Sequence, residues 1–285
     1  MNNPTYFEAL KWASLLIQEH HGDENAPELI MMDRMEWNRT ELLVHYRQQL
    51  RLDQWQQFQK DVQRAVNGEP VQYITNKANF YGREFYVDSR VLIPRVETEE
   101  LVENILNAHP QLNQPLRVLD IGTGSGNIAI TLKLERPDWQ VTAVDIASEA
   151  LAVAQQNAHQ QEAVVDFRQG SLFDAVKGER FDIIVSNPPY IAENERDVMD
   201  QSVIEYEPDK ALFAPDDGLF WYKQIGRQLA NHLTNAGQLW CEFGYHQGAK
   251  LKQYFSELPG VKDVDVLQDL SGHERILWVR GGSVI

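Results

Sequence analysis

The motif Asn187-Pro188-Pro189-Tyr190 combines residue types that can hold a weakly nucleophilic nitrogen beside an electrophile. It follows residues 181–186, an apolar run typical of a buried parallel strand. The side-chain oxygen of Asn187 and the carbonyl of Pro188 can each accept a hydrogen bond from an N–H of a planar amide or amine. Two fixed acceptors orient that nitrogen and stabilise developing positive charge, while Tyr190 can pack against the flat group. The motif therefore predicts group transfer to a planar nitrogen.

A glycine-rich turn predicts where the electrophile is held. Residues 117–121 have the pattern of a strand, residues 127–130 begin a helical run, and the turn between them contains three glycines. Glycine lets the backbone turn sharply and lets a ligand approach it closely. The dinucleotide-binding pattern requires a glycine where this chain has Asn127, so the turn departs from that pattern. Asp145 ends the next strand, where a carboxylate can bind both hydroxyls of a ribose.

Alternating strands and helices must position these two motifs. We predict seven strands, at residues 117–121, 140–145, 164–169, 181–186, 237–243, 261–268 and 274–280. This order indicates an α/β fold with a mostly parallel, doubly wound sheet. The last two strands are separated by only five residues, which favours an antiparallel hairpin at a sheet edge. Both motifs then follow the carboxyl ends of strands, where ligands bind in such sheets.

The segment before the sheet has a different pattern. Apolar residues recur at helical spacing from about residue 5 to 67, which predicts a small helical bundle. Aromatic, strand-like residues at 80–87 and an apolar run at 91–93 then predict a linking β-hairpin, and a helix is expected to begin near Glu97. We therefore expect three segments: a helical domain at 1–70, a hairpin linker at 71–95, and a larger domain at 96–285.

The glycine turn, the acidic residue after the second strand and the Asn-Pro-Pro-Tyr motif together resemble class I S-adenosylmethionine-dependent methyltransferases. The resemblance implies that S-adenosyl-L-methionine is the cofactor and S-adenosyl-L-homocysteine the product. It implies no metal ion. The cofactor-binding residues implied on this chain include Asn187 and, after the third strand, Leu172. The others in the sheet are Asp120, Gly122, Thr123, Gly124, Ser125, Gly126 and Asp145.

Three further segments resemble release-factor glutamine methyltransferases: residues 68–74, 93–103 and 269–275. The resemblance implies transfer of the methyl group to the side-chain amide nitrogen of the glutamine in the GGQ motif of class I peptide chain release factors. It also implies that the N-terminal helical domain helps to bind the release factor. Arg95, Glu97 and Thr98 would lie near the mouth of the cofactor and substrate site. Position 96, often proline in this family, is Val96, a departure that removes no chemical group.

Other functions stay open at this point. Residues 75–88 also resemble the methyltransferases of a large-subunit ribosomal protein, which likewise modify glutamine, although Thr98-Glu99 favours release factors. A nucleic-acid amino methyltransferase would be expected to carry a target-reading domain and a basic surface. A partner-binding scaffold with a vestigial cofactor fold is the non-enzymatic alternative, and loss of cofactor binding would indicate it.

Composition restricts the remaining classes of protein. The 285-residue chain has a net charge of −16, which argues against a duplex-binding surface. We find no run long enough to span a membrane, and the single cysteine, Cys241, cannot form an internal disulfide. We therefore expect a cytoplasmic protein, and a monomer because no exposed apolar stripe is evident. Glu242 and His246, near the end of the fifth strand, could line the pocket, but a structural role is favoured.

Overall fold

A computed structural model describes residues 3–282, which form two compact units. The first unit combines the chain up to residue 77 with residues 87–89 and 200–206, and the rest forms the second. This grouping differs from the three segments expected from the sequence. The reason is that the hairpin residues 78–86 belong to the larger, second unit. Residues 200–206 lie within the sequence of the second unit but belong to the first.

The first unit is the helical bundle that the sequence predicted. Its helices are α1 (Tyr6–Glu19), α2 (Ala26–Met35), α3 (Arg39–His45), α4 (Leu52–Val66), α5 (Val71–Thr75) and α9 (Gln201–Tyr206). Thr5 begins α1 with a capping box, since its hydroxyl accepts from Glu8 N at 3.2 Å and the Glu8 carboxylate accepts from Thr5 N at 2.8 Å. The apolar sides of α1 to α5 meet in one core, in which Ile17 and Ile30 are fully buried.

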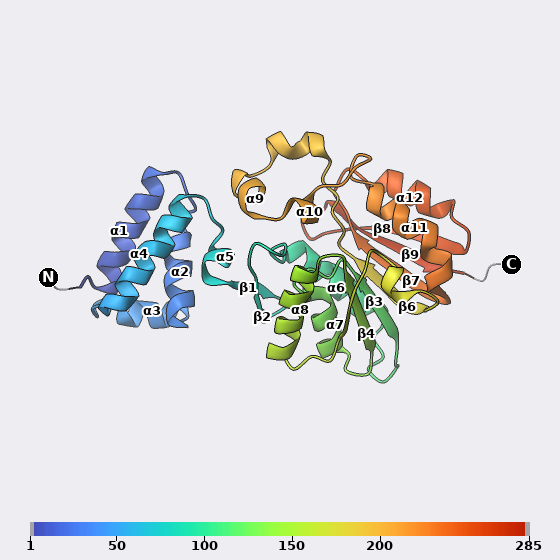
Figure 1. Ribbon diagram of the computed structural model, residues 1–285, viewed down its shortest axis with the longest axis horizontal. Coiled ribbons are helices and arrows are strands. Elements are labelled where there is room, and N and C mark those ends of the chain that lie inside the picture. Colours follow the sequence, from blue (N-terminus) through green and yellow to red (C-terminus); the bar gives the residue numbers. More distant parts are fainter. Residues whose placement is uncertain (1–2, 283–285) are drawn as a thin grey trace. The chain divides into compact units, whose positions relative to one another are not determined.

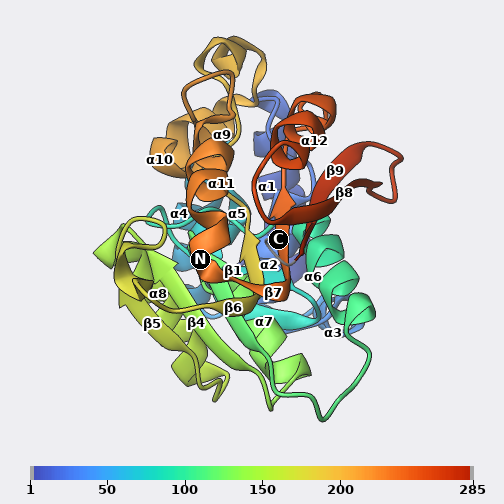
Figure 2. The ribbon, with the colours of Figure 1, turned by 90° about the vertical axis from the view of Figure 1, so that its right-hand side faces the viewer.

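The second unit is an α/β fold around a seven-stranded sheet (Figure 1). Its strands are β3 (Arg117–Ile121), β4 (Gln140–Asp145), β5 (Asp166–Gln169), β6 (Phe181–Ser186), β7 (Leu233–Glu242), β8 (Val261–Gln268) and β9 (Glu274–Gly281). Their order is β5-β4-β3-β6-β7-β9-β8. The first five strands run parallel, and β9 pairs antiparallel with both β7 and β8. The predicted edge hairpin is therefore confirmed (Figure 2).

Helices cover both faces of this sheet. They are α6 (Val96–Ala108), α7 (Asn127–Glu135), α8 (Ser148–Gln160), α11 (Phe220–His232) and α12 (Gly248–Ser256), with the short helix η1 (Asp174–Val176). Two further short helices, η2 (Glu193–Val198) and α10 (Asp209–Leu212), lie in the connection between β6 and α11. Side chains alternate between two cores: Val118 packs with α6 and α7, whereas Leu119 and Ile121 pack with α11 and α12. Burial on both faces explains why the central strands are continuously apolar.

Three predicted boundaries need correction. Strand β5 begins at Asp166 rather than at residue 164, because its pairing with β4 starts there. The hairpin is formed by β1 (Lys77–Phe80) and β2 (Arg83–Tyr86), whereas the sequence analysis placed strands near 80–87 and 91–93. Tyr81 and Gly82 both have positive φ, of 50° and 72°, and reverse the chain inside the predicted strand. Strand β7 begins at Leu233 rather than at residue 237, because Leu233 already pairs with Phe181 before a bulge.

Candidate active site

The sheet brings the two sequence motifs side by side. Strands β3 and β6 are parallel neighbours, with Ile121 opposite Ser186, so the turns that follow them start next to one another. The Ser186 hydroxyl donates to the Ile121 carbonyl at 2.8 Å and ties these two strand ends together. Strand order also reverses between β3 and β6, which is where ligands bind in open α/β sheets.

The backbone of the glycine turn is fixed by hydrogen bonds that it donates to the neighbouring strand β4. Gly122 N and Thr123 N both donate to the Val144 carbonyl, at 2.9 and 3.1 Å. Gly122 and Gly124 have positive φ, and a Cβ at either would meet no atom within 4 Å. Gly126, just before α7, also has a positive φ, of 83°, and a Cβ there would in addition crowd α8, 3.3 Å from Ala154 Cα. The turn is therefore held by β4 on one side, while the side toward which Gly122 and Gly124 would direct a Cβ is open.

Two carboxyl groups flank this turn. One oxygen of Asp145 accepts from Gly124 N and the other from Ala147 N, both at 2.9 Å, and each oxygen keeps a lone pair for a further donor. Burial raises the pKa of Asp145 above its usual value. Asp120 is fully buried and accepts from the Thr123 hydroxyl at 2.7 Å, while its Oδ1 has no hydrogen-bond partner among residues 3–282. These features fit a ligand that brings ribose hydroxyls and positive charge.

Asn157 of α8 supports the turn and was missed by the sequence analysis. Its fully buried side chain donates to Ser125 O at 2.8 Å and to Tyr86 O at 3.0 Å, and it accepts from Tyr86 N at 2.7 Å. One side chain thus satisfies backbone groups of both the glycine turn and the hairpin. One feature of the sequence could have indicated this role: Asn157 is the single asparagine on the otherwise apolar, buried side of α8.

The acceptor motif is held by side chains from α6 and β7. Asn187 Nδ2 donates to the Thr98 hydroxyl at 3.1 Å, and that hydroxyl donates to Glu242 Oε2 at 2.6 Å. The Tyr190 hydroxyl lies 3.4 Å from Glu242 Oε1. Glu242 therefore contacts the site, directly through Tyr190 and indirectly through Thr98, although the sequence analysis interpreted it as structural.

The backbone of Tyr190 is held separately. Gln247 Nε2 donates to the carbonyls of Tyr190 and Asp217, at 2.9 and 3.1 Å, and its Oε1 accepts from Gly244 N at 3.1 Å. Gly218 packs directly against the Tyr190 carbonyl and has a φ of 77°. The position of Tyr190 thus depends on a close approach that only glycine permits.

The remaining predicted residues lie at different distances from this network. Arg95 forms an ion pair with buried Glu207 at 2.5 Å. The Glu97 side chain is exposed. Burial raises the pKa of the Tyr190 phenol and the negative charge of Glu97 raises it further, whereas the positive charge of Arg95 lowers it. Leu172 follows β5 with a φ of 51°, and its side chain packs against the core beside α11 and α12. Direct contacts of Arg95, Glu97 and Leu172 with a cofactor stay predictions.

Burial of two carboxyl groups makes the stability of the protein depend on pH. Burial raises the pKa of Glu242 and of Asp120 to about 7. The folded state therefore holds these protons more tightly than the unfolded chain, so their contribution to stability is complete at low pH and is lost as pH rises through about 7. We expect the free energy of unfolding to fall by about 2 kcal/mol per carboxyl between about pH 5 and pH 8.

Urea unfolding of Glu242→Gln at both pH values tests this expectation, because glutamine cannot titrate. The difference between pH 5 and pH 8 should shrink by about 2 kcal/mol relative to the unaltered protein. Glu24→Gln, at an exposed position in the first unit, is the matched control and should leave the difference unchanged. Equal pH dependence in the unaltered protein and Glu242→Gln would show that Glu242 does not titrate in this range.

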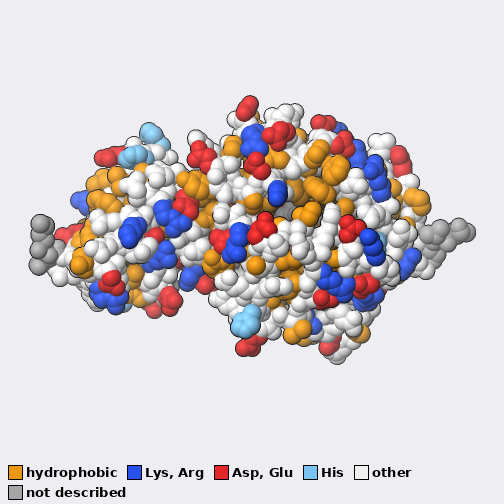
Figure 3. Space-filling view, in the orientation of Figure 1, with side chains coloured by type: hydrophobic (Ala, Val, Ile, Leu, Met, Phe, Trp, Pro, Cys, Tyr) orange, Lys and Arg blue, Asp and Glu red, His pale blue; other side chains and the backbone are white. Residues whose placement is uncertain are grey.

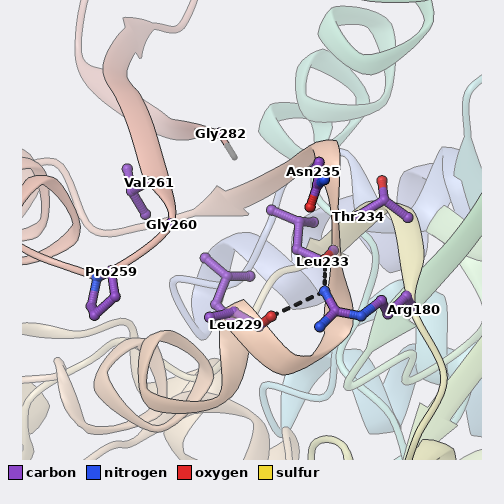
Figure 4. A pocket seen from close by; sticks show the side chains of 10 residues that line it. Arg180, Leu229, Leu233, Thr234, Asn235, Pro259, Gly260, Val261 and Gly282 are labelled. Carbon is purple, nitrogen blue, oxygen red and sulfur yellow. Dashed lines mark hydrogen bonds between the residues drawn. The ribbon is translucent and has the colours of Figure 1, made fainter. Parts of the chain in front are cut away.

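A cavity of about 390 Å³ lies elsewhere in the second unit, between the end of α11 and the starts of β7 and β8 (Figure 4). Arg180 in its wall donates to the carbonyls of Ala230 and Leu233, at 3.1 and 2.6 Å, and so binds the exposed end of α11. Arg180 and Leu233 are at the amino ends of β6 and β7, whereas both motifs follow carboxyl ends. This cavity is therefore separate from the candidate site.

Comparison with known proteins agrees with this geometry. The family model described as "PrmC N-terminal domain" matches residues 8–75, and "Methyltransferase small domain" matches residues 96–209. A structure of a methyltransferase from Pyrococcus furiosus shares the fold, with a TM-score of 0.52 and 18% identity over 72% of this chain and 91% of that one.

Two curated relatives cover nearly the whole sequence. The release factor glutamine methyltransferase of Enterococcus faecalis is 40% identical over 95% of this chain and 97% of its own length. That of Bacillus subtilis is 41% identical over 96% of both chains. With this identity over this length, and with both halves of the chain matched, the chain belongs to the release factor glutamine methyltransferase family.

Proposed function

We propose that this protein transfers a methyl group from S-adenosyl-L-methionine to the side-chain amide nitrogen of the glutamine in the GGQ motif of class I peptide chain release factors. The observation that carries the proposal is the position of Asn187-Pro188-Pro189-Tyr190 directly beside the glycine turn, at the carboxyl ends of neighbouring strands. Membership in the family and the matched N-terminal domain support this substrate.

The residues around the glycine turn would hold the cofactor. Asp145 keeps lone pairs for the ribose hydroxyls, and the open side of Gly122 and Gly124 leaves space for a ligand against the backbone. Asp120 has a carboxyl oxygen without a partner among residues 3–282, and a cationic ligand nearby would favour its ionised form. The chemistry that S-adenosyl-L-methionine supplies when bound is an electrophilic methyl group on a positively charged sulfur.

Asn187 and Pro188 would supply the orientation that an amide nucleophile needs. The amide nitrogen of glutamine is a poor nucleophile because its lone pair is delocalised into the carbonyl. Asn187 Oδ1 and the Pro188 carbonyl would each accept one of its N–H groups, which aims the nitrogen and stabilises positive charge as the bond to carbon forms. Orientation of this kind can contribute up to roughly 7–11 kcal/mol. The proton is lost after transfer, when the nitrogen has become acidic.

Charge and surface properties fit a protein substrate. On the face shown in Figure 3, Lys and Arg side chains lie among Asp and Glu side chains, which is unlike a phosphate-binding surface. None of the helices within residues 3–282 is long and apolar enough to cross a membrane. The N-terminal helices would bind the release factor, and the protein would act as a cytoplasmic monomer without direct contact to nucleic acid.

Methyl transfer from labelled S-adenosyl-L-methionine to three purified acceptors tests the proposal. The acceptors are a class I release factor, its variant with alanine in place of the GGQ glutamine, and the large-subunit ribosomal protein. We expect label on the unaltered release factor alone. Label on the ribosomal protein alone would keep the chemistry and change the partner, and absence of label from a protein that binds the cofactor would point to nucleic acid.

A further inference from the structure

The two polar side chains of the acceptor motif, Asn187 and Tyr190, are both linked by hydrogen bonds to the buried carboxyl group of Glu242. Glu242, at the end of β7, accepts from the Thr98 hydroxyl with one oxygen and lies 3.4 Å from the Tyr190 hydroxyl with the other. Thr98 in turn accepts from Asn187. Glu242 is 1% exposed and Thr98 2% exposed, so water does not compete for these hydrogen bonds.

The direction of these hydrogen bonds determines how the Asn187 amide is turned. A hydroxyl has one proton, and an ionised Glu242 has none to give, so above about pH 7 the Thr98 hydroxyl is the donor across their 2.6 Å contact. Thr98 can then only accept from Asn187, so the NH₂ end of the Asn187 amide must face Thr98. The oxygen of that amide consequently faces away from Thr98. Without Glu242, Thr98 could donate instead, and the amide could rotate and present its NH₂ group to the substrate.

We propose that Glu242 and Thr98 are positioning residues, which together fix the Asn187 amide with its oxygen toward the acceptor nitrogen. The inference rests on the proposed function, because the correct end of the amide matters only if a substrate N–H must be accepted. Glu242 acts through Thr98 and does not itself touch the substrate amide. Its role requires an acceptor oxygen at this place, which a neutral glutamine also provides.

The alternative is that this network only ties α6 to β7. Other contacts already hold β7 in place, because it pairs with β6 and β9 along its length and its carbonyl at Glu242 accepts from the Tyr222 hydroxyl at 2.7 Å. A purely structural role predicts loss of stability without a specific loss of rate. A positioning role predicts a loss of rate that depends on Asn187.

Single-turnover methylation of a class I release factor at saturating cofactor separates the two. We expect Thr98→Val, which keeps the shape and removes the hydroxyl, to slow transfer by about 10- to 100-fold. Thr98→Ser keeps the hydroxyl and should remain within about threefold of the unaltered rate. Cofactor affinity, measured by calorimetry, should change little in both. Thr131→Val is the matched control, since Thr131 is also fully buried and its hydroxyl has no partner among the described residues.

Two further comparisons make the test specific. In an Asn187→Ala background, Thr98→Val should slow transfer further by less than about twofold, because the amide it orients is gone. Glu242→Met should be as slow as Thr98→Val, whereas Glu242→Gln, which retains an acceptor oxygen, should remain within about threefold of the unaltered rate. If Thr98→Val does not fold, the comparison of Glu242→Met with Glu242→Gln tests the positioning role instead.

An unaltered protein that does not methylate the release factor would show that the proposed function is wrong. An active unaltered protein whose Thr98→Val or Glu242→Met variant is equally fast would overturn the positioning role alone. The same conclusion would follow if Thr98→Val slowed transfer equally with and without Asn187.

Discussion

Replacement of Asn187 by alanine is expected to lower the rate of methyl transfer by about 10²–10³-fold while leaving cofactor binding nearly intact. The substitution removes one of the two acceptors that orient the amide nitrogen and stabilise its developing charge, and loss of one such preorganised group has effects of about this size. The glycine turn keeps its hydrogen bonds to Val144 and Asp145 of β4, and Asp145 keeps its bond from Ala147 N, so the cofactor site retains its backbone. Single-turnover rates and calorimetric cofactor affinity measure the two effects separately.

A matched asparagine provides the control for this prediction. Asn194 lies in η2, a few residues after the motif, and is exposed. Asn194→Ala should therefore leave both rate and cofactor affinity unchanged. If Asn187→Ala instead lost cofactor affinity and kept a normal rate at saturating cofactor, the orienting role of Asn187 would be wrong.

The position of the motifs was predictable because it depends on local patterns and one general property of parallel sheets. Residues 117–121 and 181–186 are apolar enough to be recognised as buried strands, and parallel strands end at the same edge. The sheet order makes these two strands neighbours, which places the two motifs side by side. The glycine turn, Asp145 and Asn187 therefore followed from the sequence without knowledge of tertiary contacts.

The residues that support the site were not predictable in the same way. Glu242 stands among apolar residues of a strand, and nothing local shows that its partner is Thr98, which lies 144 positions earlier. Asn157 satisfies two backbone segments that are distant in sequence. Helix α9 joins the first unit although its sequence lies within the second, and its six residues are too few to show a periodic pattern. In each case the determining interaction is long-range.

Gly218→Ala is expected to lower both the stability of the protein and the rate of methyl transfer, because the acceptor motif fills the space that a side chain at position 218 would need. A Cβ at this position would overlap the Tyr190 carbonyl oxygen and Gln247 Nε2, and would lie 2.8 Å from the Tyr190 carbonyl carbon. Most of these atoms are backbone, so the clash can be relieved only by moving the loop that carries Tyr190. We expect a loss of about 3 kcal/mol in the free energy of unfolding, from steric overlap and from the positive φ together.

The rate of transfer should fall by about 100-fold in the same variant, since a displacement near 1 Å is enough to misplace the acceptor. Gly178→Ala separates strain from overlap: Gly178 has a φ of 78°, nearly equal to the 77° of Gly218, but a Cβ there would meet no atom within 4 Å. That control should lose only about 1–2 kcal/mol of stability and no activity. If both variants lost the same stability and kept the same rate, packing of Gly218 against Tyr190 would have no part in positioning the acceptor motif.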